Sequence, residues 1–249
     1  MNYLSILWLI LMLCVSPLFA KGAPITIGIM KLNPPFAVQM SKDEVYGFDI
    51  DMMNSLCKIM ERKCTYKFVY LKDLIPFVAN GTVDISVSSI TINAERARIV
   101  NFSIPYMVSY TRFLAQRNAN PPAFSLEALS GKAIAVKKGD IFRKELESLG
   151  ITNVKIKEYL NTAEELQALN SGEVNYVILD DAVAHYWSTS YSKEFMLAGP
   201  AYQYGNGFAI AVNPKDPVLL ADIDKALRIY QDSEDYKNNY DKFIKRFDK

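Results

Sequence analysis

Short apolar runs alternate with amphipathic stretches along most of the chain. Residues 25–30 are almost all apolar and predict a buried strand, and residues 47–62 have the period of a helix, with Ile50 and Met53 on its apolar face. Further strands are predicted at 64–70, 83–89, 132–139, 154–159, 175–181 and 207–213, and further helices at 74–81, 125–131, from 140, at 162–172, through 187, and over 223–230 and 236–247. Strands that alternate with helices predict parallel sheets covered on both faces, an α/β fold.

The first twenty residues differ from the rest of the chain. Residues 4–15 form an apolar run that is short for a membrane span, and Pro17 and Ala20 follow it. This pattern predicts a cleaved secretory signal peptide over residues 1–20. Because no Lys or Arg precedes the run and Leu18 is large for its position, an uncleaved anchor is the alternative. No later segment is predicted to span a membrane.

Charge and composition exclude some classes of partner. The 28 Lys and Arg residues nearly balance the 27 Asp and Glu residues, for a formal net charge of +1. This balance does not favour nucleic acid or an anionic membrane as a partner. With 249 residues, half of them hydrophobic, the chain can build one large or two modest cores.

Two cysteines, Cys57 and Cys64, remain once the signal peptide is removed. They close a short loop in an exported chain, which predicts a structural disulfide, with two buried free thiols as the alternative. A metal pair is not favoured because there is no second pair of ligands and His185 is the single histidine. No metal or cofactor is expected.

Two predicted strands end in polar side chains. The segment "SSITINAER", residues 88–96, follows an apolar run and ends in Arg96, and Asp180 ends another apolar run. Parallel sheets bind ligands at the carboxyl ends of their strands, so a cation and an anion at such ends predict a zwitterion held between them. Taken singly, Arg96 would be a solvated helix residue and Asp180 a helix cap.

Five segments in order, "PPF", "GFDIDMMNSLC", "LIPFVANGTVDISVSSITINAERARIVNFSIPY", "GKAIAVKKGD" and "VILDDAV", resemble the bacterial extracellular solute-binding proteins that serve polar amino-acid ABC transporters. The resemblance covers essentially the whole mature chain. It implies a type II periplasmic-binding-protein fold, with two α/β lobes, a hinge that the chain crosses twice, and a cleft that closes on the ligand. Residues 23–113 plus 208–249 are expected to form one lobe and residues 114–207 the other, to within a few residues.

The resemblance also implies how the ligand's carboxylate is held. Arg96 matches the Arg that binds the α-carboxylate, for which its planar fork is suited. Thr91 offers its hydroxyl and backbone N–H to the same group. Backbone amides near Asp140 and Ile141, at a helix start, are expected to complete the carboxylate shell.

The rest of the cleft follows the family only in part. Ser89 matches a position whose carbonyl accepts from the α-ammonium, and Asp180 matches the carboxylate that meets the ammonium from the opposite lobe. Basic-ligand relatives commonly have an acidic residue at the position of Met30 and a stacking aromatic at that of Asn33, and both are missing here. Lys137 matches a position that touches the side-chain amide in glutamine-binding relatives, so it disfavours a cationic ligand if it points inward.

Other features favour a basic ligand. Asp140, Asp49 and Asp73 are candidates for negative charge, although Asp49 also fits a helix start. The pair Cys57 and Cys64 resembles the lysine/arginine/ornithine, histidine and arginine branch. Arginine is therefore expected first, with glutamine or another uncharged polar amino acid as the alternative. Three aromatic residues are expected to line the cleft, with Phe36 first because a stiff Pro-Pro turn precedes it: Phe36, Tyr106 and Phe77.

The function implied by the resemblance is the periplasmic binding component of an amino-acid ABC importer, a monomer that delivers a free L-amino acid to an inner-membrane permease. An exported cyclohexadienyl-dehydratase-like enzyme on the same fold is the alternative of another class. It would need a general acid in the cleft, and Glu95 is the one Glu within the motifs. His185 is expected to be a packed or exposed histidine, since a single His without a Gly-framed Ser is not a triad.

Overall fold

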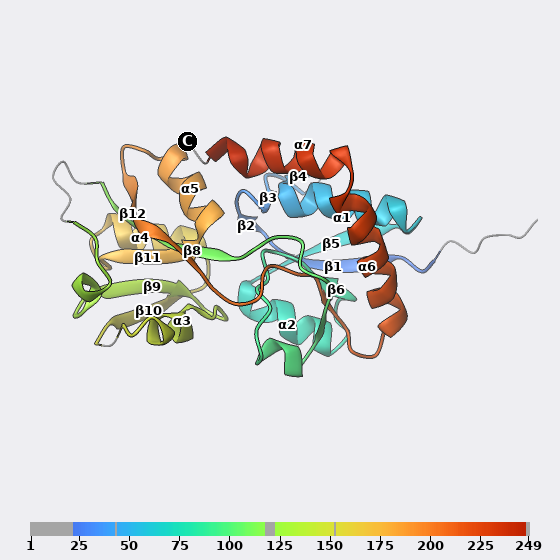
Figure 1. Cartoon of the computed structure of the whole chain (residues 1–249), viewed down its shortest axis with the longest axis horizontal. Coiled ribbons are helices and arrows are strands. Elements are labelled where there is room, and N and C mark those ends of the chain that lie inside the picture. Colours follow the sequence, from blue (N-terminus) through green and yellow to red (C-terminus); the bar gives the residue numbers. More distant parts are fainter. Residues whose placement is uncertain (1–21, 43, 118–122, 152, 248–249) are drawn as a thin grey trace, which may run out of the picture.

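Two lobes lie side by side, and each is built around its own five-stranded sheet with helices on the outside (Figure 1). The structure is a computed structural model that describes residues 22–42, 44–117, 123–151 and 153–247. The expected signal peptide, residues 1–20, lies outside the described residues. In the part of the chain that is described, no helix is long and apolar enough to cross a membrane.

The first lobe contains the N-terminal strands and the C-terminal helices (Figure 1). Its strands are β1 (Ile25–Met30), β2 (Leu32–Asn33), β3 (Ala37–Gln39), β4 (Val45–Tyr46), β5 (Cys64–Val69), β6 (Ile85–Ser86), β7 (Asn101–Phe102) and β13 (Ala211–Val212), and its helices are α1 (Phe48–Ile59), α2 (Leu71–Ala79), α6 (Pro217–Gln231) and α7 (Glu234–Phe243), with 3-10 turns η1 (Arg96–Arg98) and η3 (Lys245–Phe247). The main sheet has the order β5-β1-β6-β13-β7, and β2, β3 and β4 form a small antiparallel sheet. Because β1 pairs in parallel with β5 and β6, the carboxyl ends of these three strands meet at one edge.

The second lobe contains the middle of the chain. Its strands are β8 (Tyr110–Gln116), β9 (Ala133–Lys137), β10 (Lys155–Tyr159), β11 (Tyr176–Asp180) and β12 (Phe195–Gln203), and its helices are α3 (Phe142–Ser148), α4 (Thr162–Asn170) and α5 (Asp181–Ser190), with a 3-10 turn η2 (Glu127–Leu129). The sheet has the order β10-β9-β11-β8-β12, with β9 parallel to both β10 and β11. The carboxyl ends of β9 and β11 carry Lys137 and Asp180.

Both sheets are mixed, which corrects the sequence-based expectation of parallel sheets. β8 runs antiparallel to β11 and β12, and β13 runs antiparallel to β6 and β7. The hinge explains these directions. The chain enters the second lobe in β8 and re-enters the first lobe in β13, and both strands run away from the hinge, whereas the parallel strands of each sheet run toward it.

The helix expected at 125–131 is only the single 3-10 turn η2.

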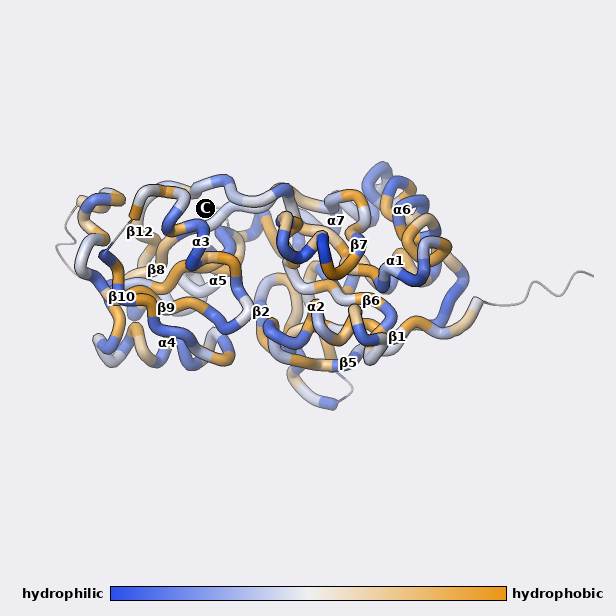
Figure 2. Tube along the Cα trace, turned by 90° about the horizontal axis from the view of Figure 1, so that it is seen from below, coloured by the Kyte–Doolittle hydropathy of each residue, from blue (hydrophilic) through white to orange (hydrophobic). Residues whose placement is uncertain are grey.

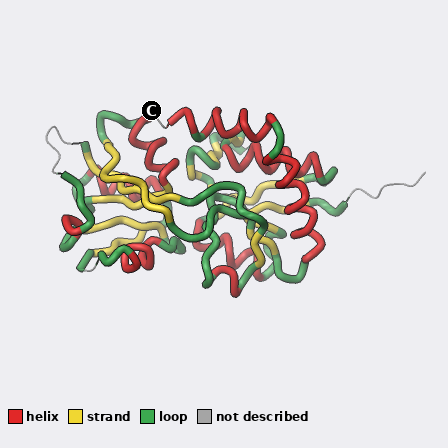
Figure 3. Tube along the Cα trace, viewed as in Figure 1, coloured by secondary structure: helices red, strands yellow, loops and turns green. Residues whose placement is uncertain are grey.

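Two neighbouring segments carry the chain between the lobes, and both are loops at the centre of Figure 3. They are bonded to each other, since Phe208 N–H donates to the Met107 carbonyl at 2.8 Å and Tyr204 N–H donates to the Ser109 carbonyl at 3.2 Å. The first segment leads into β8 at Tyr110. The lobe boundary expected at residue 113 therefore falls inside a strand of the second sheet.

Apolar residues concentrate on the central strands, where the hydrophobic colour of Figure 2 follows β1 and β9. In the first lobe four aromatic rings pack together between the sheet and the C-terminal helices. Phe36 is fully buried, with its ring centroid 5.6 Å from that of Phe208 and 6.3 Å from that of Phe48, and Tyr106 packs on both of these rings. Such a cluster gives the first lobe a rigid core below its cleft-facing edge.

A disulfide joins Cys57 and Cys64, as the sequence predicted, and the alternative of two free thiols is wrong. Cys57 lies in the last turns of α1 and Cys64 is the first residue of β5, with their Cα atoms 6.2 Å apart. The bond fixes the end of the helix to the start of the edge strand. It lies away from the residues at the carboxyl ends of the strands.

Candidate functional site

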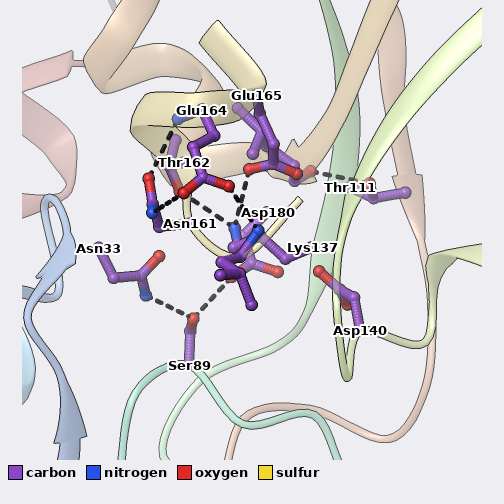
Figure 4. A network of polar contacts seen from close by, with 12 residues as sticks. Asn33, Ser89, Thr111, Lys137, Asp140, Asn161, Thr162, Glu164, Glu165 and Asp180 are labelled. Atoms are coloured by element: carbon purple, nitrogen blue, oxygen red, sulfur yellow. Dashed lines mark hydrogen bonds and ion pairs between the residues drawn. The ribbon is translucent and has the colours of Figure 1, made fainter. Parts of the chain in front are cut away.

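The polar strand ends of the two lobes meet and bond to each other (Figure 4). Ser89 Oγ, from the first lobe, donates to Asp180 Oδ2 at 2.6 Å, and Asn33 Nδ2 donates to Ser89 Oγ at 3.0 Å. The hydroxyl of Tyr204, from the second hinge segment, also donates to Asp180 and accepts from Thr91 Oγ1 at 3.1 Å. This chain of bonds connects four of the residues that the sequence selected.

Asp180 is an acceptor held between the lobes. The pKa of its carboxyl is raised to about 6, chiefly by burial and also by the nearby Asp140, while the bonds from Ser89 and Tyr204 act in the opposite direction. Its position follows from the fold, because Asp180 is the last residue of β11 and the start of α5 follows at once. A cationic hydrogen-bond donor stabilises the ionised form of a carboxylate that has little contact with water.

Arg96 spans the two lobes with its guanidinium group. Its Nη1 donates to the Thr91 carbonyl at 3.0 Å within the first lobe, and its Nη2 donates to the Gly139 carbonyl at 3.0 Å in the second lobe. The side chain of Asn93 accepts from the Arg96 backbone N–H at 2.8 Å and thereby caps the turn η1 that presents the arginine. Arg96 is only 9% exposed, so the guanidinium is largely removed from water.

The backbone around Gly139 lies close to helix α2 of the other lobe. Gly139 has φ +89, and a Cβ at this position would lie 2.5 Å from the Cα of Lys72 in α2. Only glycine fits both the backbone conformation and the space. Just after it, the Ile141 N–H donates to Oδ1 of Asp140 at 2.8 Å, so the amide that was expected to bind a ligand carboxylate serves the Asp140 side chain in this conformation.

Asp140 adds negative charge next to Arg96. Burial raises the pKa of its carboxyl, while the nearby Lys137 and Arg96 lower it. Asp140 also raises the pKa of Asp180. The residue therefore belongs to the same group of charges as Arg96 and Asp180, as the sequence suggested.

Lys137 lies at the end of β9 with 6% exposure. Its Nζ donates to Thr162 Oγ1 at 3.3 Å and lies 3.6 Å from Oε2 of Glu165 (Figure 4). Burial lowers the pKa of Lys137, but Glu165, Asp140 and Asp180 outweigh it, so the pKa is raised overall. The lysine stays charged beside the cleft.

Glu165 was not identified from the sequence. It is fully buried, and burial raises the pKa of its carboxyl to about 7 although Lys137 lowers it. The start of α4 that carries it is fixed by Asn161, whose Oδ1 accepts from Glu164 N–H at 3.0 Å. The sequence did indicate this burial. Glu165 has helical spacing from Thr162 and Leu169, which are buried, and therefore lies on the apolar face of α4.

Two of the cavities between the lobes border side chains described above. One, of about 650 Å³, is lined by residues of both lobes: Met30, Leu71, Asp73, Phe77, Lys137 and Asn161, with Lys31 and Lys67 also in its wall. The other, of about 610 Å³, is lined by Arg96, Gly139, Asp140 and Ile141. Oδ1 of the fully buried Asn33 accepts no hydrogen bond from the described residues.

Two expected site residues lie in the core of the first lobe. Phe36 was expected to line the cleft, but its ring packs on Phe48 and Phe208 and it borders neither of these cavities. Asp49, in the first turn of α1, accepts from Ser89 N–H at 3.0 Å. It therefore positions Ser89, whose φ is +44, and does not line the cavities.

Other titratable residues lie outside this group. The Nδ1 of His185 is 3.0 Å from the carbonyl of Phe247, where α5 meets the end of the chain. Glu95 is 61% exposed and pairs with Lys144 on the other lobe. Among the described residues, no three His, Cys, Asp or Glu side chains are arranged to hold a metal ion.

Two α/β lobes, a hinge of two paired segments, and hydrogen bonds of Arg96 and Asp180 that cross between the lobes are the features of a two-lobed ligand-binding protein. The chain matches the bacterial extracellular solute-binding proteins, family 3, over residues 25–246 and belongs to this family. Its fold is that of the periplasmic amino-acid-binding proteins.

Relatives of the chain include proteins named for arginine. It is 29% identical over 237 residues to the L-arginine-binding protein of Pseudomonas aeruginosa, covering 92% of this chain and 90% of the relative. It is 27% identical over 224 residues to the ABC transporter arginine-binding protein 1 of Escherichia coli, covering 88% and 90%. The crystal structure of an arginine third transport system periplasmic binding protein from Legionella pneumophila superimposes with a TM-score of 0.82 at 29% identity, covering 89% of this chain and 99% of that one.

Proposed function

We propose that this protein binds a free L-amino acid, arginine first, between its lobes in the periplasm and delivers it as a monomer to the permease of an ABC importer. The observation that carries the proposal is that Arg96 and Asp180, which are opposite in charge, each bond across the contact between the lobes, Arg96 to the Gly139 carbonyl and Asp180 to Ser89 Oγ. A free amino acid has a carboxylate and an ammonium on one carbon. It matches this pair of charges.

The backbone of the ligand would replace contacts that the protein makes with itself. Arg96 bonds to two backbone carbonyls, and Ser89 and Tyr204 donate to Asp180. An α-carboxylate between Arg96 and Thr91 would give the guanidinium a charged acceptor, which makes a stronger bond than a neutral carbonyl. An α-ammonium group next to Asp180 would neutralise the charge of a partly buried carboxylate.

The charges around the ligand's side chain support a basic amino acid. Three carboxylates, Asp140, Asp180 and Glu165, have raised pKa values chiefly because of burial. Two cations, Arg96 and Lys137, oppose them. A zwitterion adds no net charge, whereas a cationic side chain would stabilise the ionised form of these carboxylates. Asp73 in the wall of the 650 Å³ cavity is a further partner for it.

Glutamine or another uncharged polar amino acid is the second candidate. It is favoured by Lys137, which lines the same cavity, and by the apolar Met30. Lys31 and Lys67 also lie in the wall, with Lys67 Nζ 5.3 Å from the centroid of the Phe77 ring. These amino groups repel a guanidinium but can donate to an amide oxygen.

We infer that the chain is a binding protein and not a dehydratase. The Glu within the family motifs, Glu95, is exposed and paired with Lys144. The buried Glu165 is paired with Lys137. A general acid must reach the substrate's leaving group, and neither carboxyl is placed as a free acid in the space between Arg96 and Asp180.

The experiment is thermal unfolding of residues 21–249, freed of co-purified ligand, against the common amino acids and prephenate. A ligand that binds only the folded state raises the melting temperature with the logarithm of its concentration. Arginine is expected to give the largest rise, with smaller rises for lysine or histidine. The largest rise with glutamine would replace arginine by the second candidate, and a rise with prephenate alone would overturn the binding function.

A further inference from the structure

Helix α4 places a buried carboxylate behind the wall of the 650 Å³ cavity. Glu165 is fully buried and does not itself border the cavity. Neither of its carboxylate oxygens accepts a hydrogen bond from the described residues. Glu165 forms an ion pair with Lys137, in which Nζ of the lysine and Oε2 of the glutamate are 3.6 Å apart (Figure 4). Glu165 can therefore act on a ligand by offsetting the charge of Lys137.

Lys137 lines the 650 Å³ cavity, which is proposed to hold the ligand's side chain. It borders the cavity together with Met30 and Asn161, and its Nζ also donates to Thr162. Asp140 and Asp180 also raise the pKa of Lys137, but Asp180 accepts from Ser89, and Asp140 accepts from the N–H of Ile141. The carboxylate that pairs directly with the lysine is that of Glu165.

We propose that Glu165 is a positioning residue that sets the side-chain selectivity of the cleft. By cancelling the charge of Lys137, it allows the cavity to accept a cationic side chain. This inference rests on the proposed function, because it concerns the side-chain end of the same amino-acid site. It resolves the conflict between a lysine in the cavity wall and a preference for arginine.

The size of the effect follows from the distances involved. At a separation of about 6 to 8 Å from Nζ of Lys137, a cationic group would be bound about 30- to 100-fold more weakly if the lysine charge were uncompensated, at an effective dielectric constant of about 20. The same charge would strengthen the binding of an anionic side chain. Since a buried ion pair contributes little net stability, replacing both partners by neutral groups is compatible with folding.

The experiment compares three variants by calorimetric titration with L-arginine and L-glutamate: Glu165→Gln, Lys137→Met and the double variant. The measured quantity is the ratio of the two affinities, because a general loss of packing lowers both affinities and leaves the ratio unchanged. Glu158→Gln makes the same chemical change at a carboxylate that is 45% exposed in the same lobe, and is the matched control.

Glu165→Gln is expected to lower the arginine to glutamate ratio at least tenfold, and Lys137→Met in the same chain to restore it to within about threefold of the wild type. Lys137→Met alone, which keeps the inference testable if Glu165→Gln does not fold, is expected to raise the ratio. Glu158→Gln is expected to leave it unchanged. A ratio that is the same in all variants would overturn the inference and leave the proposed function standing. A wild-type protein that binds no amino acid would overturn both.

Discussion

Arg96 in the first lobe donates from Nη2 to the carbonyl of Gly139 in the second lobe at 3.0 Å. The same guanidinium donates from Nη1 to the carbonyl of Thr91, so one planar group holds backbone from both lobes. The contact links ligand recognition to lobe closure. A ligand carboxylate that bonds to Arg96 would be positioned where the two lobes touch.

Replacing Arg96 by lysine is expected to weaken the binding of all amino-acid ligands to a similar extent. Lysine keeps the charge but cannot make two parallel bonds to a carboxylate, and the loss of one charge-assisted bond corresponds to a decrease in affinity of about 10- to 100-fold. Calorimetric titration of the Arg96→Lys variant with arginine, lysine and glutamine measures this decrease in affinity. The exposed Arg98 of the same turn gives the control, Arg98→Lys. Wild-type affinity in Arg96→Lys would remove Arg96 from the site.

Gly139→Ala is expected to weaken ligand binding by hindering closure. A Cβ on Gly139 would lie 2.5 Å from the Cα of Lys72, so α2 and the loop of the second lobe must separate. Gly131→Ala is the matched control, since Gly131 has a similar φ of +74 with no atom within 4 Å of its added Cβ. Both variants carry a backbone cost of about 1 kcal/mol.

Titration calorimetry and small-angle scattering separate the two effects. Gly139→Ala is expected to lose at least tenfold in affinity and to scatter as a more open molecule, while Gly131→Ala changes only the free energy of unfolding. Equal affinities for the two variants would show that the lobes do not close in the way the structure describes.

The stability of the protein is expected to fall as pH rises from 4 to 8, in part because of Asp49. Burial raises the pKa of its carboxyl to about 7, against the bond from Ser89 N–H, whereas the unfolded chain has a pKa near 4. Between these values the folded protein holds a proton that the unfolded chain has released, so the free energy of unfolding decreases with pH, by at most about 4 kcal/mol.

Asp49→Asn tests this directly, since the amide oxygen can still accept from Ser89 N–H. Urea unfolding at pH 5 and pH 8 is expected to show a smaller difference in the variant than in the wild type. The difference does not vanish, because Glu165 and Asp180 also have raised pKa values. The same difference in both proteins would mean that Asp49 is ionised throughout this range.

Removal of the disulfide is expected to lower stability without changing ligand selectivity. Cys57 and Cys64 are seven residues apart, and a loop of this size accounts for about 2 kcal/mol in the free energy of unfolding. Denaturant unfolding of the double variant Cys57→Ala, Cys64→Ala measures the loss, and titration with arginine and glutamine measures selectivity. A changed ranking of ligands would connect the loop to the site.

The placement of Arg96, Thr91, Ser89 and Asp180 could be anticipated from the sequence. Polar residues at the ends of apolar runs indicate the ligand edge of α/β sheets, and the resemblance to solute-binding proteins placed them on opposite lobes. Mixed sheets were not anticipated, because the direction of a strand next to the hinge depends on how the chain enters the lobe.

Packing between distant elements accounts for the remaining differences. Helical spacing puts Glu165 on the apolar face of α4, but its partner Lys137 comes from the distant strand β9, and this pairing depends on how the two elements pack. The Pro-Pro turn suggested a ring held in the cleft, but the space beside Phe48 and Phe208 directs Phe36 into the core. The close approach of Gly139 to Lys72 depends on the relative position of the lobes.

The most direct measurement compares the binding of L-arginine with that of agmatine, which has the same guanidinium but no α-carboxylate. Calorimetric titration of residues 21–249 gives both affinities. Agmatine keeps the amino group assigned to Asp180 but lacks the carboxylate assigned to Arg96, so it is expected to bind at least about 100-fold more weakly than arginine. Equal binding of the two compounds would contradict the assignment of the cleft to a free amino acid.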